Sequence, residues 1–411
     1  MKRKDNLAIS SSRIKKGRIY WNRSMRDAVR CVRKHRQLSR AQLAEELGLS
    51  PSSMTEMIRS LLKIGVLRTD EWVATPGRGR PQQMLKVGRE GFYSLGISIG
   101  FEVDLVLLNP SFEEVAHQRF PNDFRDVKGT PEKGIRKLLK SIQKMIESIS
   151  NGKLVEIGVS VSGDIFSDHT NIYSTNDFLN LEQARFFLEE LRKLSDCPVK
   201  VINDAHVSVL AERWMNPELP VNPSLLYVTR RLGVGMILEG SLYEGPVQWS
   251  RSLSHFQVNR EGSYCYCGEK GCLATTATPD VISERLVGRT WSDPSRSVQA
   301  RKKDLEMLWD RYVKGDREIV EKIHRGLEDF SAALRNISTL FSFDAIIWEP
   351  WDERFSKDLL RRLEMASAAW LQRIPSKKIQ VSVIGENQQA VGAGIFAMED
   401  FFNNLLKNSS D

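Results

Sequence analysis

The cysteines near residue 270 have the spacing of a metal-binding loop. The segment reads Cys265-Tyr-Cys267-Gly-Glu-Lys-Gly-Cys272, and His255 lies upstream of it. Three thiolates and one imidazole complete the tetrahedral shell that zinc takes in structural sites, and the intervening glycines let the backbone fold around an ion. Because the protein fills all four positions, the pattern predicts a structural zinc and not a hydrolytic one. A chance grouping of buried thiols is the alternative interpretation.

A second group of short polar side chains surrounds the pair Ser50-Pro51. A serine followed by proline is typical of a helix start, because serine caps the first turn and proline fits its first position. Hydroxyl and guanidinium groups on such a helix reach phosphates and base edges in a DNA major groove. The side chains that this interpretation assigns to DNA are Arg40, Ser50, Ser52, Ser53, Thr55, Glu56 and Arg59.

The elements that position these side chains are three short helices and a strand. Amphipathic stripes between Ser24 and Leu67 predict the helices, and Gly48 lies in the short turn between the second and the third. A strand then begins at Val66-Leu67-Arg68. This is the order of a winged helix-turn-helix, which we place at residues 21–75. Protein-interaction modules also use such three-helix units.

Charge favours DNA as the partner. Residues 1–90 hold 21 Lys and Arg against 8 Asp and Glu, a net charge of +13, whereas the rest of the chain has a net charge of −5. A basic segment on a mildly acidic body is typical of a polyanion-binding module. A solvated basic tail is the alternative, and residues 1–20 are expected to be a flexible basic arm.

The run Thr75-Pro-Gly-Arg78-Gly-Arg80-Pro-Gln82 follows the predicted strand. One interpretation is a plain linker, which we place at residues 76–90. The other is a turn whose arginines, Arg78 and Arg80, follow the minor groove or the phosphate backbone beside the wing. The residues alone favour neither.

From residue 91 to 411 the pattern changes to alternating strands and helices. Continuous apolar runs such as Tyr93–Ile99 and Leu154–Val161 alternate with helical stretches such as 131–149 and 316–340, which predicts open sheets with flanking helices. No run approaches the ~20 apolar residues of a membrane span, and the start lacks a signal peptide. The protein is therefore expected in the cytoplasm, on the nucleoid when bound to DNA, with no membrane partner.

Together these residues resemble the ROK family (repressors, open reading frames and sugar kinases) over about residues 20–400. Ile202-Asn-Asp-Ala-His206 resembles its Asn-Asp-Ala catalytic motif, and His255 with the three cysteines matches its zinc signature. Tyr93-Ser-Leu-Gly-Ile-Ser-Ile-Gly100 resembles the start of the family's xylose- and N-acetylglucosamine-responsive repressors, and Gln389–Gly394 resembles the family's C-terminal helix. The resemblance implies an α/β fold, in which a winged helix-turn-helix precedes a two-lobed, actin-like (ribonuclease-H-like ATPase) body of the sugar-kinase kind.

The departures from the family pattern argue against kinase activity. Where family kinases hold ATP phosphates in an Asp-x-Gly-Gly-Thr turn, this chain has Ser98-Ile-Gly-Phe-Glu102. The second phosphate loop is Thr229–Gly235 with two arginines, and the double glycine of the nucleotide site is Trp348-Glu349. Phosphates need small residues and accessible backbone N–H groups. Asp204, at the family's general-base position, then has no phosphoryl donor, so we expect no enzyme.

The resemblance also implies a sugar site, which this chain keeps in part. The matching positions are Ser162, Gly163, Asn176, Asn203, Asp204 and His255. Two family glutamates are replaced by Ser252 and Ala274, which predicts weakened or redirected sugar binding. A purely structural role for Asn203 and Asp204 is the alternative.

These observations favour a transcriptional regulator, a repressor of carbohydrate-related genes, that binds a double-stranded DNA operator as a homodimer or homotetramer. Its body is expected to sense a sugar or a sugar derivative and to close over it. Two other hypotheses stay open at this point. One is an ATP-dependent sugar kinase with an accessory DNA-binding domain, and the other is a constitutive DNA binder with a vestigial ligand pocket.

Overall fold

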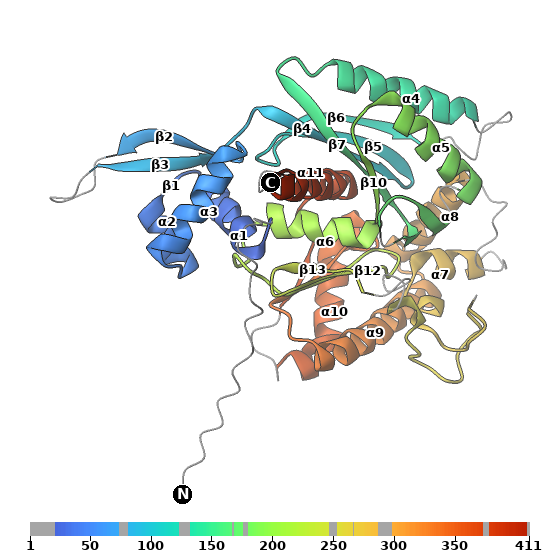
Figure 1. Cartoon of the computed structure of the whole chain (residues 1–411). Helices are drawn as coiled ribbons and strands as arrows, with labels where there is room; N and C mark the ends of the chain where they lie inside the picture. The colour runs from blue at the N-terminus through green and yellow to red at the C-terminus, as the bar shows by residue number, and fades with distance from the viewer. Residues whose placement is uncertain are drawn as a thin grey trace, which may run out of the picture.

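The computed structural model describes residues 21–73, 81–122, 132–166, 168–175, 180–245, 253–265, 267–286, 298–372 and 378–408. They form a small N-terminal domain, α1 to β3, beside a body of two lobes, with α6 and α11 running between the lobes (Figure 1). The predicted arm, residues 1–20, lies outside the described residues. Among the helices of the described part, none is both long enough and apolar enough to cross a bilayer.

The N-terminal domain has the predicted order of helices and strands. Its elements are α1 (Arg23–Lys34), β1 (Leu38–Ser39), α2 (Arg40–Leu47), α3 (Pro51–Lys63), β2 (Leu67–Val73) and β3 (Gln82–Val87). The sheet order is β1-β3-β2, and the antiparallel pair β2–β3 forms the wing. Residues 82–87 belong to the predicted linker, so the second strand of the wing lies where a plain connection was expected.

Local chemistry sets the bounds of the α2 and α3 helices. Ser39 and Gln42 form a reciprocal capping box at the start of α2, and Gly48 ends that helix in the left-handed conformation. The side chain of Ser50 then accepts a hydrogen bond from the backbone N–H of Ser53. The predicted cap at Ser50 is therefore confirmed, and together with Gly48 it explains why the turn between the two helices is short.

The first lobe is built on a five-stranded sheet with the order β10-β7-β4-β5-β6. Its strands are β4 (Gly91–Ile99), β5 (Glu102–Leu108), β6 (Glu114–Pro121), β7 (Gly152–Val161) and β10 (Val199–Asn203). The helices α4 (Glu132–Glu147) and α5 (Leu181–Leu194) share a hydrophobic core with one face of this sheet. Strands β8 (Gly163–Ile165) and β9 (Ile172–Thr175) form a small hairpin that follows β7 and lies close to the start of α6.

The second lobe has a five-stranded sheet with the order β13-β12-β11-β14-β15. Its strands are β11 (Leu225–Val228), β12 (Val234–Leu238), β13 (Ser241–Tyr243), β14 (Ala345–Trp348) and β15 (Lys378–Val381). The helices of this lobe are α7 (Pro279–Leu286), α8 (Val298–Val313), α9 (Arg317–Leu340) and α10 (Ser356–Leu371), with short 3-10 turns at Leu253–His255, Leu273–Thr275 and Glu353–Phe355. Parallel pairing of β11, β14 and β15 aligns their carboxyl ends at one edge of the sheet.

Helices α6 (Asp204–Met215) and α11 (Gln388–Asn408) connect the lobes at close range. A Cβ atom on Gly392 of α11 would lie 1.9 Å from the backbone oxygen of Val207 in α6, so only glycine fits there. The α11 helix also packs against the first-lobe strands β4, β5 and β7. The two central helices therefore form one packed unit between the sheets.

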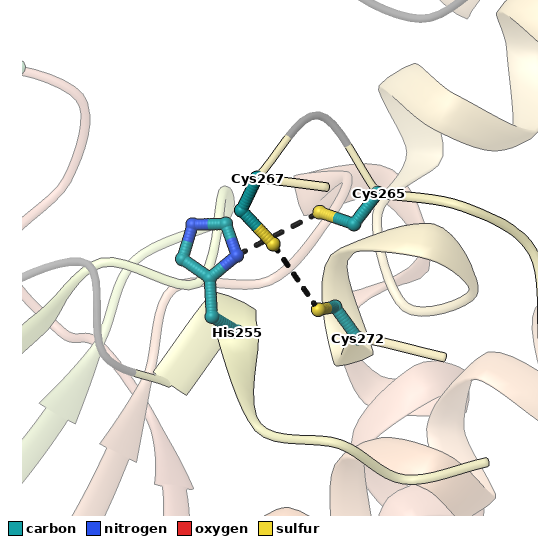
Figure 2. A group of neighbouring side chains, drawn as sticks. All are labelled: His255, Cys265, Cys267 and Cys272. Atoms are coloured by element: carbon teal, nitrogen blue, oxygen red, sulfur yellow. Dashed lines mark hydrogen bonds between the residues drawn. The ribbon is translucent and has the colours of Figure 1, made fainter. Parts of the chain in front are cut away.

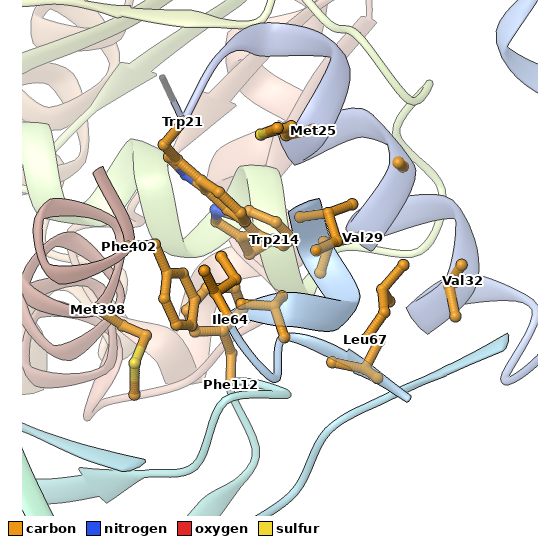
Figure 3. Packing of buried hydrophobic residues seen from close by; sticks show 14 of the residues in the cluster. Trp21, Met25, Val29, Val32, Ile64, Leu67, Phe112, Trp214, Met398 and Phe402 are labelled. Carbon is orange, nitrogen blue, oxygen red and sulfur yellow. The ribbon is translucent and has the colours of Figure 1, made fainter. Parts of the chain in front are cut away.

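The N-terminal domain and the body share a single hydrophobic core (Figure 3). The domain contributes Val29 of α1 and Ile64 after α3, and the body contributes Trp214 of α6 and Phe402 of α11. The ring centroids of Trp21 and Phe402 lie 5.0 Å apart. Because these side chains are buried only when both parts are in place, their burial stabilises the joint as well as each part.

Arginines of α1 hold the same joint by hydrogen bonds. The Arg30 guanidinium donates to the backbone carbonyls of Leu219 (3.3 Å) and Val221 (2.7 Å). The Arg33 guanidinium donates to the carbonyl of Trp214, at the end of α6. These positive charges face the body. The charge of +13 in residues 1–90 is therefore only partly available to a polyanion, which corrects the composition argument.

Candidate functional site

The α3 helix exposes the polar face that the sequence assigns to DNA. Its buried side is apolar, with Met54, Met57, Ile58 and Leu61 in the core. The opposite side is exposed and carries Ser52, Ser53, Thr55, Glu56 and Arg59. Two further predicted contacts, Arg40 at the start of α2 and the cap Ser50, are exposed as well. The predicted set thus lies on the solvent side of one small domain.

Hydrogen bonds order the first turn of α3. The hydroxyl of Ser50 lies 3.0 Å from the hydroxyl of Ser52 and 3.1 Å from that of Ser53. The Thr55 hydroxyl donates to the carbonyl of Pro51 at 2.8 Å. A hydroxyl oxygen has two lone pairs, so these groups retain acceptor capacity. The exposed N-terminal turn of a helix also favours phosphate, because its backbone N–H groups point outward.

The wing adds an aromatic residue that the sequence reasoning missed. The Trp72 side chain, near the tip end of β2, is 61% exposed, which is unusual for so large an apolar group. The wing strands are otherwise not strongly basic, because Lys86 forms an ion pair with Asp70. Arg78 and Arg80 lie outside the described residues. The sequence did contain a signal for a surface role, namely a tryptophan within a strand that is otherwise mostly polar.

A cavity of about 800 Å³ lies in the body and is lined from both lobes. Its first-lobe walls include Gly100 and Phe101 at the β4–β5 turn, and Asp204, the first residue of α6, also lines it. Its second-lobe walls include the loop after β11 and the α8 helix. A cleft of this volume, enclosed by two lobes, is the usual form of a small-molecule site.

Two of the predicted sugar positions, Ser162 and Asp204, line this cavity, whereas Gly163 and Asn203 are not among its lining residues. The Asn203 side chain is committed to the fold: its oxygen accepts from the backbone N–H groups of Ala205 and His206, and its nitrogen donates to the carbonyl of Gly163 at 3.0 Å. It therefore holds the Ser162-Gly163 turn against the start of α6.

Not every predicted sugar position reaches this place. His255 is not among the residues that line the cavity, and its ring nitrogen Nδ1 lies 3.6 Å from the Cys265 sulfur. Asn176 lies outside the described residues. The structure thus brings Ser162, Gly163, Asn203 and Asp204 together and places His255 with the cysteines.

The environment of Asp204 sets its charge. Burial, with a smaller contribution from the nearby Glu349 carboxylate, raises the pKa of this carboxyl to about 6, although hydrogen bonds from Ser162 and from the backbone N–H of Ala205 oppose the shift. Desolvation disfavours the charged form of an acid, which is the physical cause of the rise. At pH above 6 Asp204 is an acceptor for hydroxyl groups that enter the cavity.

Acidic side chains stand at both former phosphate loops. Glu102 pairs with Lys302 of α8 across the cleft at 3.6 Å. Glu349 accepts a hydrogen bond from the backbone N–H of Arg230 at 3.1 Å and pairs with its guanidinium at 3.5 Å. The cations that could bind the phosphates of a nucleotide are therefore already paired with carboxylates. This geometry agrees with the prediction that the phosphate contacts are lost.

Two tryptophans that line the cavity were not predicted as site residues. Trp309 of α8 and Trp351 after β14 both line the cavity. The Trp309 ring stacks on Phe355, with centroids 5.5 Å apart. Sequence reasoning used position 348–349 only to note a lost glycine pair. The signal that was available is the density of aromatic residues in the segment Trp348–Phe355.

The predicted metal ligands converge in the second lobe (Figure 2). One ligand atom from each of His255, Cys265, Cys267 and Cys272 lies within 4.8 Å of the others, so the cluster is able to hold a metal ion. The Cys267 and Cys272 sulfurs are 3.6 Å apart. Three sulfurs and one ring nitrogen form the donor set that zinc favours over the oxygen-seeking ions.

The backbone around the cluster depends on one glycine. Gly271 has a φ of 70°, and a Cβ atom there would lie 1.4 Å from the backbone oxygen of Asn259. Cys265 also accepts at its carbonyl from the backbone N–H of Gly268 in a tight turn. The loop is therefore folded so that its sulfurs face inward, as the spacing predicted.

The chain belongs to the ROK family, whose sequence profile matches residues 94–399. A second profile, winged helix-turn-helix DNA-binding, matches residues 22–68. Both agree with the architecture described above: a winged helix-turn-helix followed by a sugar-kinase-like α/β body. The predicted family and fold class are therefore confirmed.

The chain is similar over most of its length to characterised regulators. It is 24% identical over 389 residues to the DNA-binding transcriptional dual regulator NagC of Escherichia coli K12, with 92% of each chain covered. It is 22% identical to the xylose repressor of Bacillus subtilis 168, covering 90% of this chain and 94% of the relative.

Solved structures show the same fold. One is a ROK family transcriptional regulator described as a homolog of the Escherichia coli MLC protein, with a TM-score of 0.67 at 20% identity, covering 95% of this chain and 99% of that one. Another is the ROK hexokinase of Thermus thermophilus, with a TM-score of 0.59 at 17% identity. The hexokinase match covers 75% of this chain and 98% of the kinase.

Proposed function

We propose that this protein is an operator-binding transcriptional repressor whose ROK body senses a sugar or a sugar derivative. The observation that carries the proposal is the exposed polar face of α3, ordered by its serine cap and presented beside the wing. Relatives of matching length support it, because they are named N-acetylglucosamine repressor and xylose repressor. The DNA contacts we assign to this face are Ser52, Ser53, Thr55, Glu56 and Arg59, with Arg40 and Ser50 at its border.

The remaining parts of the proposal concern organisation. The arginines Arg78 and Arg80 are assigned to the DNA backbone or minor groove, beside the wing. Zinc is the metal we assign to the His255 cluster, in a structural role, because the chain offers four ligands and leaves no open position. The active form is a homodimer or homotetramer, which would present two N-terminal domains to two half-sites.

A sugar kinase is the function that these residues support least. A nucleotide would have to displace Glu349 from the backbone N–H of Arg230 and separate Glu102 from Lys302. The likeness of this chain to solved kinases, at under 20% identity, concerns the fold alone. Asp204 then serves the ligand as a hydrogen-bond acceptor and has no phosphoryl group to act upon.

The proposal is tested by operator binding of the full chain. Genomic fragments are selected by footprinting, and gel-shift titrations follow at several salt concentrations. Arg59→Ala should weaken binding by about 1–3 kcal/mol if Arg59 reads a base edge, or lower the salt slope by about one if it contacts a phosphate. Arg317→Ala is the matched control, because Arg317 is exposed on α9 in the second lobe. Binding to no genomic fragment, or equal binding by both variants, would contradict the proposal.

A constitutive DNA binder with a vestigial pocket is the second candidate. It is favoured by one observation: both polar atoms of the Asn203 side chain already have partners within the protein. It predicts that operator affinity does not respond to any sugar. A sugar that shifts the gel-shift midpoint would exclude it, whereas Asp204→Asn should abolish such a response without affecting the free protein's DNA affinity.

A further inference from the structure

The cavity between the lobes is larger than one sugar ring needs. Its lining includes Ser162, Asp204 and Phe101, and its volume is about 800 Å³. Proteins hold drug-sized ligands in pockets of about 300–1,000 Å³, so this one lies near the upper end of that range. A single sugar ring at Asp204 would leave much of this volume unfilled.

The charges along the cavity disfavour a phosphorylated ligand. Among the described residues that line it are five basic side chains, and each has a carboxylate partner. The pairs are Arg119–Asp104, Arg230–Glu349, Arg231–Asp280, Lys302–Glu102 and Arg354–Asp352. Further acids, Asp204, Glu306 and Glu353, also face the space. A phosphate would meet carboxylates and would have to break an ion pair to gain a cation.

One aromatic side chain of the lining is open enough to stack on a ring. Phe101 is half-buried and lines the cavity, whereas Trp309 and Trp351 are 3% and 2% exposed and offer little surface to a ligand. An aromatic face favours the apolar face of an uncharged ring. Such a ring also suits a lining whose described cations are all paired.

We propose that the cleft takes an uncharged glycoside made of two rings, and not a free monosaccharide or a sugar phosphate. One sugar ring lies at Ser162 and Asp204, and a second ring on the glycosidic oxygen lies against Phe101. The second ring is either another sugar or an aryl group, since both offer an apolar face. The inference rests on the proposed sugar-sensing function and names the class of its ligand.

Calorimetry on the full, metal-loaded chain tests this inference. The probes are glucose, xylose and N-acetylglucosamine, the 6-phosphates of the two hexoses, the corresponding β-linked disaccharides, and the nitrophenyl β-glycosides. We expect one disaccharide or nitrophenyl glycoside to bind at least about tenfold more tightly than its own monosaccharide, with the 6-phosphates weakest. The disaccharide and nitrophenyl arms distinguish a second sugar from an aryl group.

Two variants connect the affinity to the residues. Phe101→Ser should weaken glycoside binding by about tenfold and leave monosaccharide binding unchanged, because it removes only the contact with the second ring. Phe166→Ser is the matched control, since Phe166 is an exposed phenylalanine of the same lobe and does not line the cavity. Asp204→Asn should weaken both ligand types. Circular dichroism confirms that each variant is folded.

The outcomes separate the inference from the function beneath it. Equal affinity for a monosaccharide and its glycosides, or tightest binding of a 6-phosphate, would overturn the inference and leave sugar sensing intact. An unchanged glycoside affinity in Phe101→Ser would overturn it as well. Silence from every probe would contradict both the inference and the sensing function, while operator binding by the same preparation would still stand.

Discussion

Asp204 stands where family kinases have a general base, and the proposed function gives it a different role. Its carboxyl is enclosed at the start of α6, with Glu349 nearby and Ser162 as a hydrogen-bond donor. In a kinase such an acid acts on a substrate hydroxyl beside a bound nucleotide. In the proposed function Asp204 orients a ligand by accepting a hydrogen bond, and its burial is a cost to the folded state.

Replacing Asp204 by Asn should stabilise the free protein, and more so at high pH. The raised pKa, about 6 against 3.8 unfolded, means that the folded state resists ionisation of this group. The penalty grows as pH rises from about 4 to 6 and is complete above 6. Its upper limit is roughly 3 kcal/mol, since one pKa unit is worth about 1.4 kcal/mol. Thermal unfolding of Asp204→Asn and wild type at pH 5 and pH 8 measures the difference.

Asp316→Asn provides a control of opposite sign. A hydrogen bond from Arg311 holds the pKa of Asp316 below its usual value, so ionised Asp316 stabilises the folded state above pH 4. This variant should therefore lose stability at both pH values. A gain for Asp204→Asn that is equal at pH 5 and pH 8 would contradict the burial argument.

At the scale of elements, α6 connects the cavity with the N-terminal domain. Its first residue, Asp204, faces the cavity, and its last turn carries Arg213 and Trp214 into the joint with α1. Arg213 is 1% exposed and lies 3.5 Å from Asp27 of α1 and 3.8 Å from Glu399 of α11. Three elements therefore meet around one buried guanidinium.

Removing this guanidinium should loosen the joint. Arg213→Met leaves Asp27 with only the longer contact of Arg23, at 3.9 Å, and breaking one partner of a buried pair costs up to about 3–5 kcal/mol. Adding Asp27→Leu should recover part of the loss, since the buried carboxylate of α1 is then gone as well, while Glu399 keeps its hydrogen bond from Trp21. Urea unfolding of the single and double variants measures the two effects. Arg317→Met, which removes an exposed pair with Glu321, should change stability by less than about 1 kcal/mol.

A double variant no more stable than Arg213→Met alone would contradict this account of the joint. It would mean that packing of the arginine stem, and not its charge, holds α1 and α6 together.

An element could be predicted from the sequence when the residues that cause it lie close together in the chain. Strands β4, β7 and β11 were recognised because buried strands read as continuous apolar runs. Strand β6 was missed, since its residues are mostly exposed at the sheet edge and show no clear alternation. Strand β3 was assigned to a linker, because a Gly- and Pro-rich turn precedes it.

The same distinction applies to the candidate sites. The metal cluster and the α3 face were predicted because the four ligands and the serine cap lie within short segments of the chain. The joint was not predicted, since Arg30 finds its acceptors about 190 residues away, at Leu219 and Val221. The tryptophans that line the cavity were missed for the same reason, because α8 and the loop after β14 meet only in the folded chain.

At the scale of the whole molecule, the metal cluster should contribute to the stability of the second lobe. A metal that binds the folded loop and not the unfolded chain stabilises the folded state by mass action. Cys267→Ser should lower both the metal content per chain and the Tm. Elemental analysis by mass spectrometry and thermal unfolding measure the two quantities. Cys197→Ser is the matched control, because Cys197 is half-buried in the first lobe and outside the cluster.

Equal metal content in Cys267→Ser and wild type would contradict the ligand assignment. A full metal content in Cys197→Ser with a normal Tm would show that the loss belongs to the cluster and not to cysteine replacement in general.

The core shared by the two parts has a consequence for how such regulators can be rebuilt. A DNA-reading unit that ended at a flexible tether could be exchanged for another with little loss. Here a foreign unit would have to bring groups that cover Trp214 and Phe402 and donors that match the carbonyls at Leu219 and Val221. Swapping at residue 90 would leave an open apolar surface on the body. New operator specificity is therefore more readily reached by changing the exposed face of α3 than by exchanging the domain that carries it.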